Sequence, residues 1–224
     1  DHQPLPVAAA MRRAGVLLHP TALPGTPACG SLGRVAHAWI DALADQGIGA
    51  WQLLPLAPTD GTGSPYSSPS GFALNPWLLD GEQLVADGLL DRSDLEALPA
   101  DADPGQLNIL LAQRRADLLA EALQRRAPLW PEQQRQALAR WRAQQAFWLQ
   151  DHCRFMVLRR LQQQRPWWEW PAPLARRDRA ALRRLEQDHA GELEREALLQ
   201  WQLQHQWQRL LDHARHRGVE VIGD

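Results

Sequence analysis

The feature that most constrains the fold is a strand–helix–strand pattern in the first quarter of the chain. Residues 15–18 form a short apolar run before a loop rich in glycine and proline, which predicts a buried strand. Apolar side chains then recur at helical spacing up to Gly47, a residue type that commonly ends helices. A second apolar run follows at residues 50–55. Two strands joined through a helix lie parallel, so the pattern predicts an α/β fold. The predicted buried face of the helix contains Ala36, Trp39, Ile40 and Leu43.

The loop after the second predicted strand is unusually long. Residues 56–76 contain three Gly, four Pro and four Ser, together with Asp60, Tyr66 and Asn75. Structured loops of about 20 residues are uncommon in compact domains and are often functional. This loop also follows the carboxyl end of a parallel strand, where α/β folds place their sites.

The rest of the chain is predicted to be helical until a third strand near its end. Gly218 ends the last helix, and residues 219–222 then predict a strand parallel to the first two. Three parallel strands leave an exposed edge and cannot close a barrel, so we expect the N-terminal part of a longer protein. The predicted helical stretches are Glu82–Gly88, Ser93–Ala97, Gly105–Arg126, Glu132 to about Gln164, and one capped by Asp178 that runs to about Arg217.

Composition excludes several classes of protein. Hydrophobic residues make up 45% of the 224 residues and charged residues 22%, as in ordinary globular proteins. No apolar run is long enough to span a membrane, and the first residues do not form a secretory signal, so we expect a cytoplasmic protein. All 24 basic residues are Arg, and they alternate with acids and amides at helical spacing, which argues against nucleic-acid binding. Cys29 and Cys153 are expected to be reduced thiols.

Residues that could carry chemistry do not form a complete catalytic set. His213 and His216 have chelate spacing, but His205 lies about 16 Å from His216 along a helix, so the three cannot share a metal ion. The serines of the long loop lie outside a nucleophile elbow, and no histidine partner is identified for Cys29. Glycosyl transfer with retention needs two carboxyl groups, and Asp60 and Asp224 lie where such groups occur without an evident second partner.

Eleven tryptophans are the main oddity of the composition. Indole rings can stack on the apolar faces of sugars, but most tryptophans pack in cores. Trp141 and Trp148 are seven residues apart on one predicted helix seam, and Trp51 lies in a strand, so we assign all three to the core. Trp77, beside the long loop, is the better candidate to face a sugar.

Several motifs, in the right order, resemble those of amylomaltases, the 4-α-glucanotransferases of glycoside hydrolase family 77. The resemblance covers the chain from Arg13 to Asp224. It rests on residues 15–25 and 30–33 (first strand and loop), 51–59 (second strand), 64–76 (substrate loop), 167–171 (helical insertion) and 221–224 (third strand).

The resemblance implies a fold and an activity. We expect the first three strands of a (β/α)8 TIM barrel with a large helical insertion between the second and third strands. The activity implied is transfer of α-1,4-glucan segments between maltodextrins by a retaining double displacement. The expected parts are residues 1–13 (N-terminal extension), 14–80 (first βαβ unit and substrate loop), 81–217 (helical insertion) and 218–224 (third strand).

The resemblance also implies roles for single residues. Tyr66 matches a tyrosine near the cleavage subsites, and Ser64 and Asn75 match positions that line or shape that pocket. Asp224 matches an acid at the tip of the third strand that holds the sugar or its hydrogen-bond network. Trp77 replaces a common tyrosine, as Trp168 also does, and each keeps the aromatic face without the hydroxyl.

In that family the three catalytic carboxylates lie on later strands, so no catalytic residue is expected in this chain, and the chain alone is expected to be inactive. Its expected partners are α-1,4-glucans, with no nucleic acid, membrane, cofactor or metal. The alternatives are a hydrolase of the same clan, which would give only shorter products, and a non-catalytic carbohydrate-binding or scaffold protein of the same fold.

Overall fold

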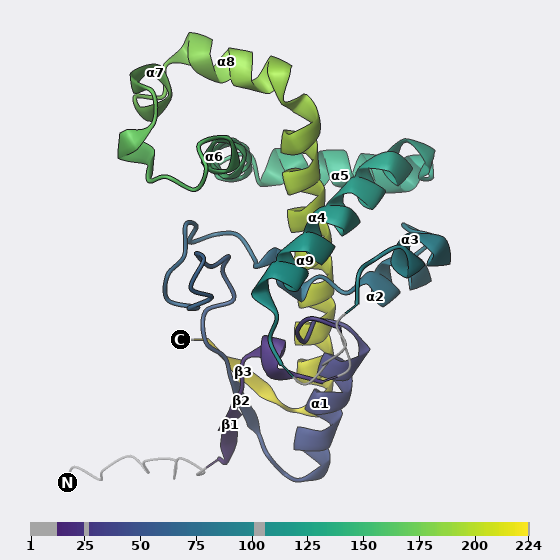
Figure 1. Ribbon diagram of the computed structural model, residues 1–224. Coiled ribbons are helices and arrows are strands. Elements are labelled where there is room, and N and C mark those ends of the chain that lie inside the picture. The colour runs from purple at the N-terminus through teal and green to yellow at the C-terminus, as the bar shows by residue number, and fades with distance from the viewer. Residues whose placement is uncertain (1–12, 25–26, 101–105, 224) are drawn as a thin grey trace, which may run out of the picture.

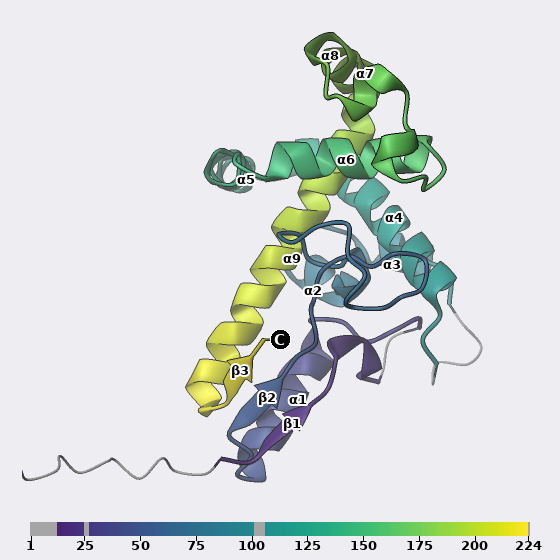
Figure 2. The same ribbon diagram turned by 90° about the vertical axis from the view of Figure 1, so that its left-hand side faces the viewer.

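Figure 1 shows the computed structural model of the chain. The structure describes residues 13–24, 27–100 and 106–223. The strands lie together at one end of the molecule, and helices extend from them toward the other end (Figures 1 and 2). Helices α7 (Ala172–Ala175) and α8 (Arg179–Asp188) lie farthest from the sheet.

The sheet consists of three short parallel strands in the order β1-β2-β3. Strand β1 spans Gly15–Leu17, β2 spans Ala50–Gln52 and β3 spans Glu220–Ile222. In the register, Trp51 on the central strand is opposite Val16 on one side and Val221 on the other. The three strands and their parallel pairing were predicted from the sequence and are confirmed.

Helix α1 (Arg34–Asp45) makes the crossover between β1 and β2. Its buried residues, Ala36, Ile40 and Leu43, lie on the predicted face, with Trp39 packed beside them. The helix ends just before Gly47, whose φ of +71° is a left-handed conformation that favours glycine. The predicted strand–helix–strand unit is therefore confirmed.

The remaining elements lie between β2 and β3 in the chain, apart from one short turn of helix after β1. In chain order they are η1 (Pro20–Ala22), η2 (Pro76–Leu78), α2 (Gly81–Ala86), α3 (Arg92–Glu96), α4 (Ile109–Arg126), η3 (Ala127–Leu129), α5 (Glu132–Gln144), α6 (Leu149–Leu161), η4 (Trp167–Glu169), then α7, α8 and α9 (Ala190–Arg217).

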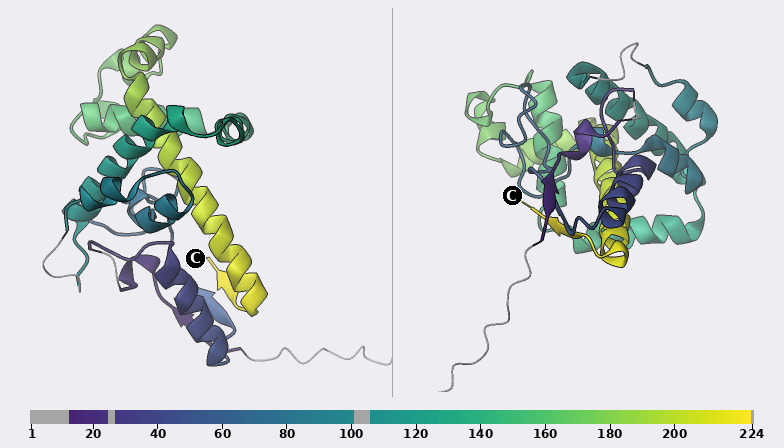
Figure 3. Two further views of the ribbon diagram at one scale, coloured as in Figure 1. Left: turned by 90° about the vertical axis from the view of Figure 1, so that its right-hand side faces the viewer. Right: turned by 90° about the horizontal axis from the view of Figure 1, so that it is seen from below.

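Helix α9 connects the distal helices to the sheet. Its 28 residues run from the α8 end down to the sheet, alongside α1, α4 and α6 (Figure 3). Gly218 ends it with a φ of +71°, and the chain enters β3 two residues later, as predicted. Because a helix of this length contacts both the sheet layer and the distal helices, it fixes the position of one relative to the other.

Two of the predicted helices are each divided in two. The stretch expected from Glu132 to Gln164 breaks after Gln144, and the stretch expected to reach Arg217 breaks at His189, whose φ is −128°. Neither break contains proline or glycine, so local propensity did not reveal them. At the first break the Trp148 indole donates to the Gln145 side chain (2.7 Å), while Asp178 caps α8 as predicted.

One continuous hydrophobic core joins the sheet to the helices. Trp51 is fully buried, and Trp141 and Trp148 are 8% and 6% exposed, which confirms that these three belong to the core. A second, smaller cluster lies at the distal end around Val157 and Trp170.

Candidate functional site

The long loop after β2 is closed at its neck. The amide of Asn75 donates to the carbonyl of Leu56 (2.8 Å), so the two ends of the loop lie side by side. Within the loop, the Asp60 amide donates to the Ser67 carbonyl (2.9 Å) and makes an inner closure. Figure 2 shows the loop folded beyond the carboxyl end of β2. Its shape is therefore defined by hydrogen bonds, as is common for long functional loops.

Two glutamines of α9 anchor the segment that returns from the loop. The Leu74 amide donates to Gln200 Oε1, and Gln200 Nε2 donates to the Leu74 carbonyl, both at 2.9 Å. Six residues farther along both segments, Gln206 makes the same pair with the backbone of Asp80 at 2.8 and 2.9 Å. Both glutamines are buried. Sequence reasoning missed them, because no local pattern connects side chains to partners 126 residues away.

Tyr66 and Ser64 share one turn of the loop. The Ser64 carbonyl accepts from the Ser67 amide (3.1 Å), and the Ser64 amide donates to Thr62 Oγ1 (3.3 Å). Tyr66, between them, has 65% of its surface exposed. The structure thus presents the ring of Tyr66 on a braced turn where a ligand can reach it.

Asn75 is buried at the end of the loop. Its Oδ1 accepts from the Trp77 amide (3.1 Å), and its carbonyl accepts from the Leu78 amide (3.0 Å), so it caps η2. These contacts give Asn75 a structural role at the end of the loop.

Trp77 lines a cavity of about 360 Å³ that lies beside α4. Its indole N–H donates to Gln113 Oε1 (3.1 Å), and Gln113 Nε2 donates to Asp117 Oδ1 (3.0 Å). Burial raises the pKa of Asp117. Tyr66 is not among the described residues that line this cavity, so the structure does not bring Trp77 and Tyr66 into one pocket there.

Asp60 is a partly exposed carboxylate. It accepts hydrogen bonds from the Thr62 amide (2.9 Å) and the Thr62 hydroxyl (2.5 Å), and these bonds lower the pKa of Asp60. A general acid needs a raised pKa at neutral pH, so Asp60 is unsuited to protonate a leaving group. Its contacts brace the turn that carries Ser64.

His19 lies where the carboxyl ends of β1 and β2 meet. Its Nε2 is 3.3 Å from the Pro55 carbonyl, which can only accept, so Nε2 carries the proton. Its Nδ1 is then the acceptor for the Thr21 hydroxyl (2.7 Å). Burial lowers the pKa of His19, which favours this neutral form. His19 was not predicted as a site residue. Its position just after the first strand, at the carboxyl end of the sheet, could have indicated it.

The far side of the loop packs against the break between α5 and α6. Phe72 stacks on Trp148 (centroids 6.0 Å apart, planes at 18°) and meets Phe147 edge-on (5.7 Å, 85°). A hollow of about 440 Å³ lies beside this contact, between the loop, α5 and α9, and Phe72, Trp141, Gln204 and Trp207 are among its lining residues. The break in the helix therefore coincides with the place where the loop docks.

The remaining candidates have structural surroundings. His213 pairs with Asp41 (2.8 Å), and the ring of His205 lies 5.2 Å from that of Trp201. Among the described residues, no group of three His, Cys, Asp or Glu could hold a metal ion. None of the described helices combines the length and apolarity needed to cross a membrane. Asp224, the predicted acid of the third strand, lies outside the described residues.

Both cysteines are free in the structure, as expected. Burial raises the pKa of Cys29 and of Cys153 to about 12. Since the thiolate is the reactive form, neither thiol has the character of a nucleophile.

Comparison with known proteins decides the family. A family model described as 4-alpha-glucanotransferase, of glycoside hydrolase family 77, matches residues 18–224. The chain belongs to the 4-alpha-glucanotransferase family. The 4-alpha-glucanotransferase of Thermus thermophilus is 37% identical over 213 residues, which is 95% of this chain and 42% of that protein.

Further 4-alpha-glucanotransferases show the same relationship. The chloroplastic/amyloplastic enzyme of Arabidopsis thaliana is 34% identical over 223 residues, covering 99% of this chain and 38% of that protein. The structure of an amylomaltase from Streptococcus agalactiae in complex with acarbose superposes with a TM-score of 0.87 at 28% identity. That match covers 95% of this chain and 43% of the amylomaltase chain. The chain thus spans about two fifths of the length of these 4-alpha-glucanotransferases.

Proposed function

We propose that this chain is the N-terminal part of a 4-α-glucanotransferase that transfers α-1,4-glucan segments between maltodextrins. The observation that carries this proposal is the anchored loop beyond the parallel strands, which presents Tyr66 on a braced turn. Loops at the carboxyl ends of parallel strands are where such folds place their substrates. Membership of the family supplies the reaction.

The architecture fits the opening of a (β/α)8 barrel. Strands β1, β2 and β3 would be its first three strands, with α1 as the crossover helix on the outside. Residues 81–217 would be a helical insertion subdomain between β2 and β3, residues 14–80 the first βαβ unit with the substrate loop, and residues 218–224 the third strand. Residues 1–13 would precede the barrel.

In this proposal the chain binds the glucan and shapes the pocket, and the catalytic carboxyl groups lie on strands beyond β3. Tyr66 contacts the sugar near the cleaved bond, Ser64 and Asn75 set the shape of the loop, and Asp224 holds the sugar. Trp77 faces a more distant sugar unit from its own cavity. Retaining transfer needs two carboxyl groups about 5–5.5 Å apart, and we place these on later strands. The chain alone is then inactive.

The proposal extends to the surroundings of the enzyme. Its partners would be maltooligosaccharides and longer α-1,4-glucans in the cytoplasm. The chemistry is carried by carboxyl groups, so no cofactor or metal takes part. A hydrolase of the same clan and a non-catalytic glucan-binding scaffold are the two readings to be tested against it.

The test begins with the protein expressed from its native gene. Because the chain spans about two fifths of its relatives, we expect an intact mass of about two and a half times 25.3 kDa and conversion of maltotriose to longer as well as shorter oligosaccharides. Only shorter products would indicate a hydrolase, and glucan binding without any turnover would indicate a scaffold. Turnover of maltotriose by the purified 224-residue chain would contradict the assignment of the catalytic groups to later strands.

Tyr66 provides the residue-level test. In the full-length protein, Tyr66→Ala should lower kcat/KM by about 10²-fold, whereas Tyr66→Phe, which keeps the ring, should lose about tenfold or less. Gly61→Ala, on the same loop with nothing within 4 Å of its added Cβ, is the control and should leave kcat/KM unchanged. Equal activity of Tyr66→Ala and the control would remove Tyr66 from the site.

A further inference from the structure

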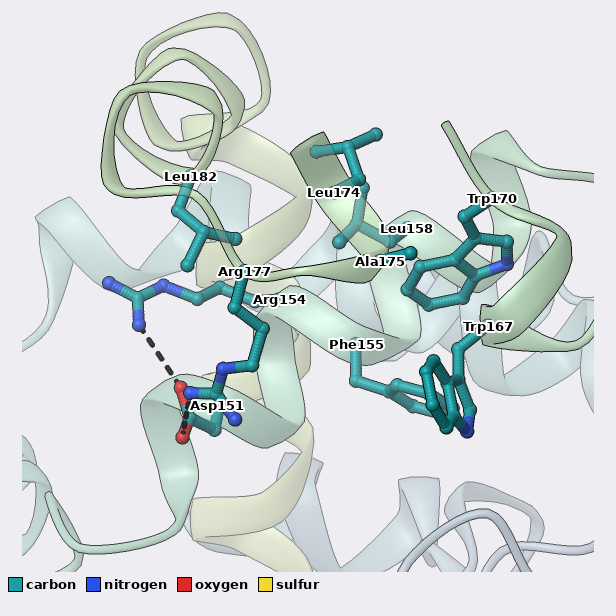
Figure 4. A pocket seen from close by; sticks show the side chains of 10 residues that line it. All are labelled: Asp151, Arg154, Phe155, Leu158, Trp167, Trp170, Leu174, Ala175, Arg177 and Leu182. Atoms are coloured by element: carbon teal, nitrogen blue, oxygen red, sulfur yellow. Dashed lines mark hydrogen bonds and ion pairs between the residues drawn. The ribbon is translucent and has the colours of Figure 1, made fainter. Parts of the chain in front are cut away.

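A second pocket lies at the distal end of the molecule, outside the loop site. It has a volume of about 340 Å³ and is formed by α6, η4, α7 and the start of α8. Figures 1 and 2 place these elements at the end of the molecule away from the sheet. The pocket is shown in Figure 4, and its lining includes Asp151, Arg154, Phe155, Trp167, Trp170 and Arg177.

One wall of the pocket is aromatic. Trp170 is buried, packs on Phe155 (centroids 5.4 Å apart) and is fixed by a hydrogen bond from its indole N–H to the Arg165 carbonyl (2.9 Å). Trp167 stands at the mouth with 51% of its surface exposed. Trp168 is adjacent and 67% exposed, but it does not line the pocket. The exposed indole of Trp167 is therefore a face that a ligand in the pocket can reach.

The opposite wall is polar, and each of its charged groups is paired. Asp151 pairs with Arg177 (2.5 Å) and with Arg154 (3.1 Å), and Arg154 also pairs with Glu186 (2.5 Å), which lies outside the pocket lining. Figure 4 shows Asp151, Arg154 and Arg177 facing the aromatic wall, with Leu174 and Ala175 between them. Because both arginines are already paired with carboxylates, the wall offers hydrogen bonds without presenting a free cation or a free anion.

This lining matches a neutral ring that has one apolar face and a polar rim. A pyranose is such a ring: its C–H face packs on an indole, and its hydroxyls both donate and accept. A phosphate or an acidic peptide would be repelled by Asp151, and an apolar peptide would take the ion pairs out of water without bonding their remaining donors and acceptors. We propose that this pocket is a second carbohydrate site that holds a distant segment of an α-1,4-glucan chain.

This inference rests on the proposed function and names a consequence of it. None of the described residues that line the pocket belongs to the loop that carries Tyr66, so a sugar bound in the pocket would be held apart from the one at the loop. Holding a long glucan at two places raises its effective concentration at the loop site, and a short glucan cannot reach both places. The site would therefore favour long substrates over short ones.

The experiment compares kcat/KM for maltoheptaose and for maltotriose in the full-length protein expressed from its native gene. Trp167→Ala removes the exposed indole from the pocket, and Ala175→Phe fills the pocket without removing any contact. Leu129→Ala is the control, since it removes a 75% exposed apolar side chain that does not line the pocket. Circular dichroism confirms that each variant is folded. Tyr66→Ala reports on the loop site.

We expect Trp167→Ala and Ala175→Phe each to lower kcat/KM for maltoheptaose by about tenfold and to change kcat/KM for maltotriose by less than about twofold, whereas Leu129→Ala should change both by less than about twofold. Unchanged kcat/KM for maltoheptaose in both pocket variants, or equal losses on the two substrates, would overturn the inference. If Tyr66→Ala lowers kcat/KM for both substrates and the two pocket variants lower neither, the loop site stands and only the distal site fails. A loss in Leu129→Ala equal to that in Trp167→Ala would also overturn it.

Discussion

The side-chain amide of Gln200 makes two hydrogen bonds with the backbone of Leu74, one through each of its polar atoms, across 126 residues of sequence. A strand neighbour would make the same pair of bonds, so the glutamine substitutes for a strand where the chain has none. Gln206 repeats the arrangement at Asp80. The position of the long loop is thus set by α9, the helix that also leads into β3.

Removing this anchor should cost stability. Gln200→Ala leaves the part-buried amide and carbonyl of Leu74 without their partners, and an unsatisfied buried polar group costs about 1–3 kcal/mol. We expect a loss of about 2–4 kcal/mol in the free energy of unfolding, measured by urea denaturation. Gln208→Ala, at an exposed position of the same helix, should stay within about 0.5 kcal/mol of wild type. Similar losses in the two variants would show that the anchor carries little energy.

Gly33 allows a test of close packing. A Cβ at Gly33 would lie 1.9 Å from Asp80 Oδ2, and that carboxylate is held by the Ser31 hydroxyl (2.6 Å) and the Gln83 amide (2.8 Å). Gly33→Ala should therefore destabilise the fold by about 3 kcal/mol or more, read as a lower midpoint of thermal unfolding. Gly61→Ala is the control, since nothing lies within 4 Å of its Cβ. A wild-type midpoint for Gly33→Ala would mean that Asp80 moves freely.

His152 should make stability depend on pH. Its ring is buried beside Trp148, and neither ring nitrogen has a hydrogen-bond partner among the described residues. Burial, and to a smaller extent the charge of Arg160, lowers the pKa of His152 from 6.5 to about 4. Below pH 6.5 the unfolded chain binds a proton that the folded chain refuses, so stability falls as the pH drops toward 4.

The expected size of this effect is about 2 kcal/mol between pH 7.5 and pH 5. It can be measured as the difference in unfolding free energy between wild type and His152→Leu at each pH. The variant should lose less stability than wild type on acidification. His216→Gln, at an exposed histidine, should follow the wild-type curve. A His152→Leu curve parallel to that of wild type would show that His152 is protonated in the folded state.

The cysteines should be unreactive until the protein unfolds. Because the pKa of each thiol is raised to about 12, little thiolate is present near neutral pH. We expect a thiol reagent at about pH 8 to label the native chain far more slowly than the same chain in denaturant, where free Cys has a pKa of about 8.5. Rapid labelling of native Cys29, detected by mass spectrometry, would show that this thiol is exposed and ionised.

Local patterns were sufficient to predict the strand–helix–strand unit. Short continuous apolar runs predicted the strands. The glycines at positions 47 and 218 follow the ends of helices, with φ values of +71°. Local patterns did not reveal the breaks after Gln144 and at His189, because there a tertiary contact or backbone turn overrides good helix propensity. The loop could be predicted from its composition, whereas its anchors at Gln200 and Gln206 depend on the fold bringing distant segments together.

The candidate site shows the same division. The motif put Tyr66 and Ser64 in one loop, and the turn that the structure shows them sharing depends only on neighbours in sequence. Trp77 was grouped with them because it follows the loop closely, but its ring lines a separate cavity beside α4. The side of a backbone on which a ring lies is decided by packing, here by the hydrogen bond from Trp77 to Gln113.

Helix α9 has a mechanical consequence. At 1.5 Å per residue its 28 residues make a rod of about 42 Å, joined to β3 by Gly218 and Val219. Tilting such a rod by one degree about its sheet end moves the other end by roughly 0.7 Å. A force applied to a ligand bound among the distal helices would therefore act on β3 as a small torque. Strand β3 and the loop are both attached to α9, so both would respond to that torque.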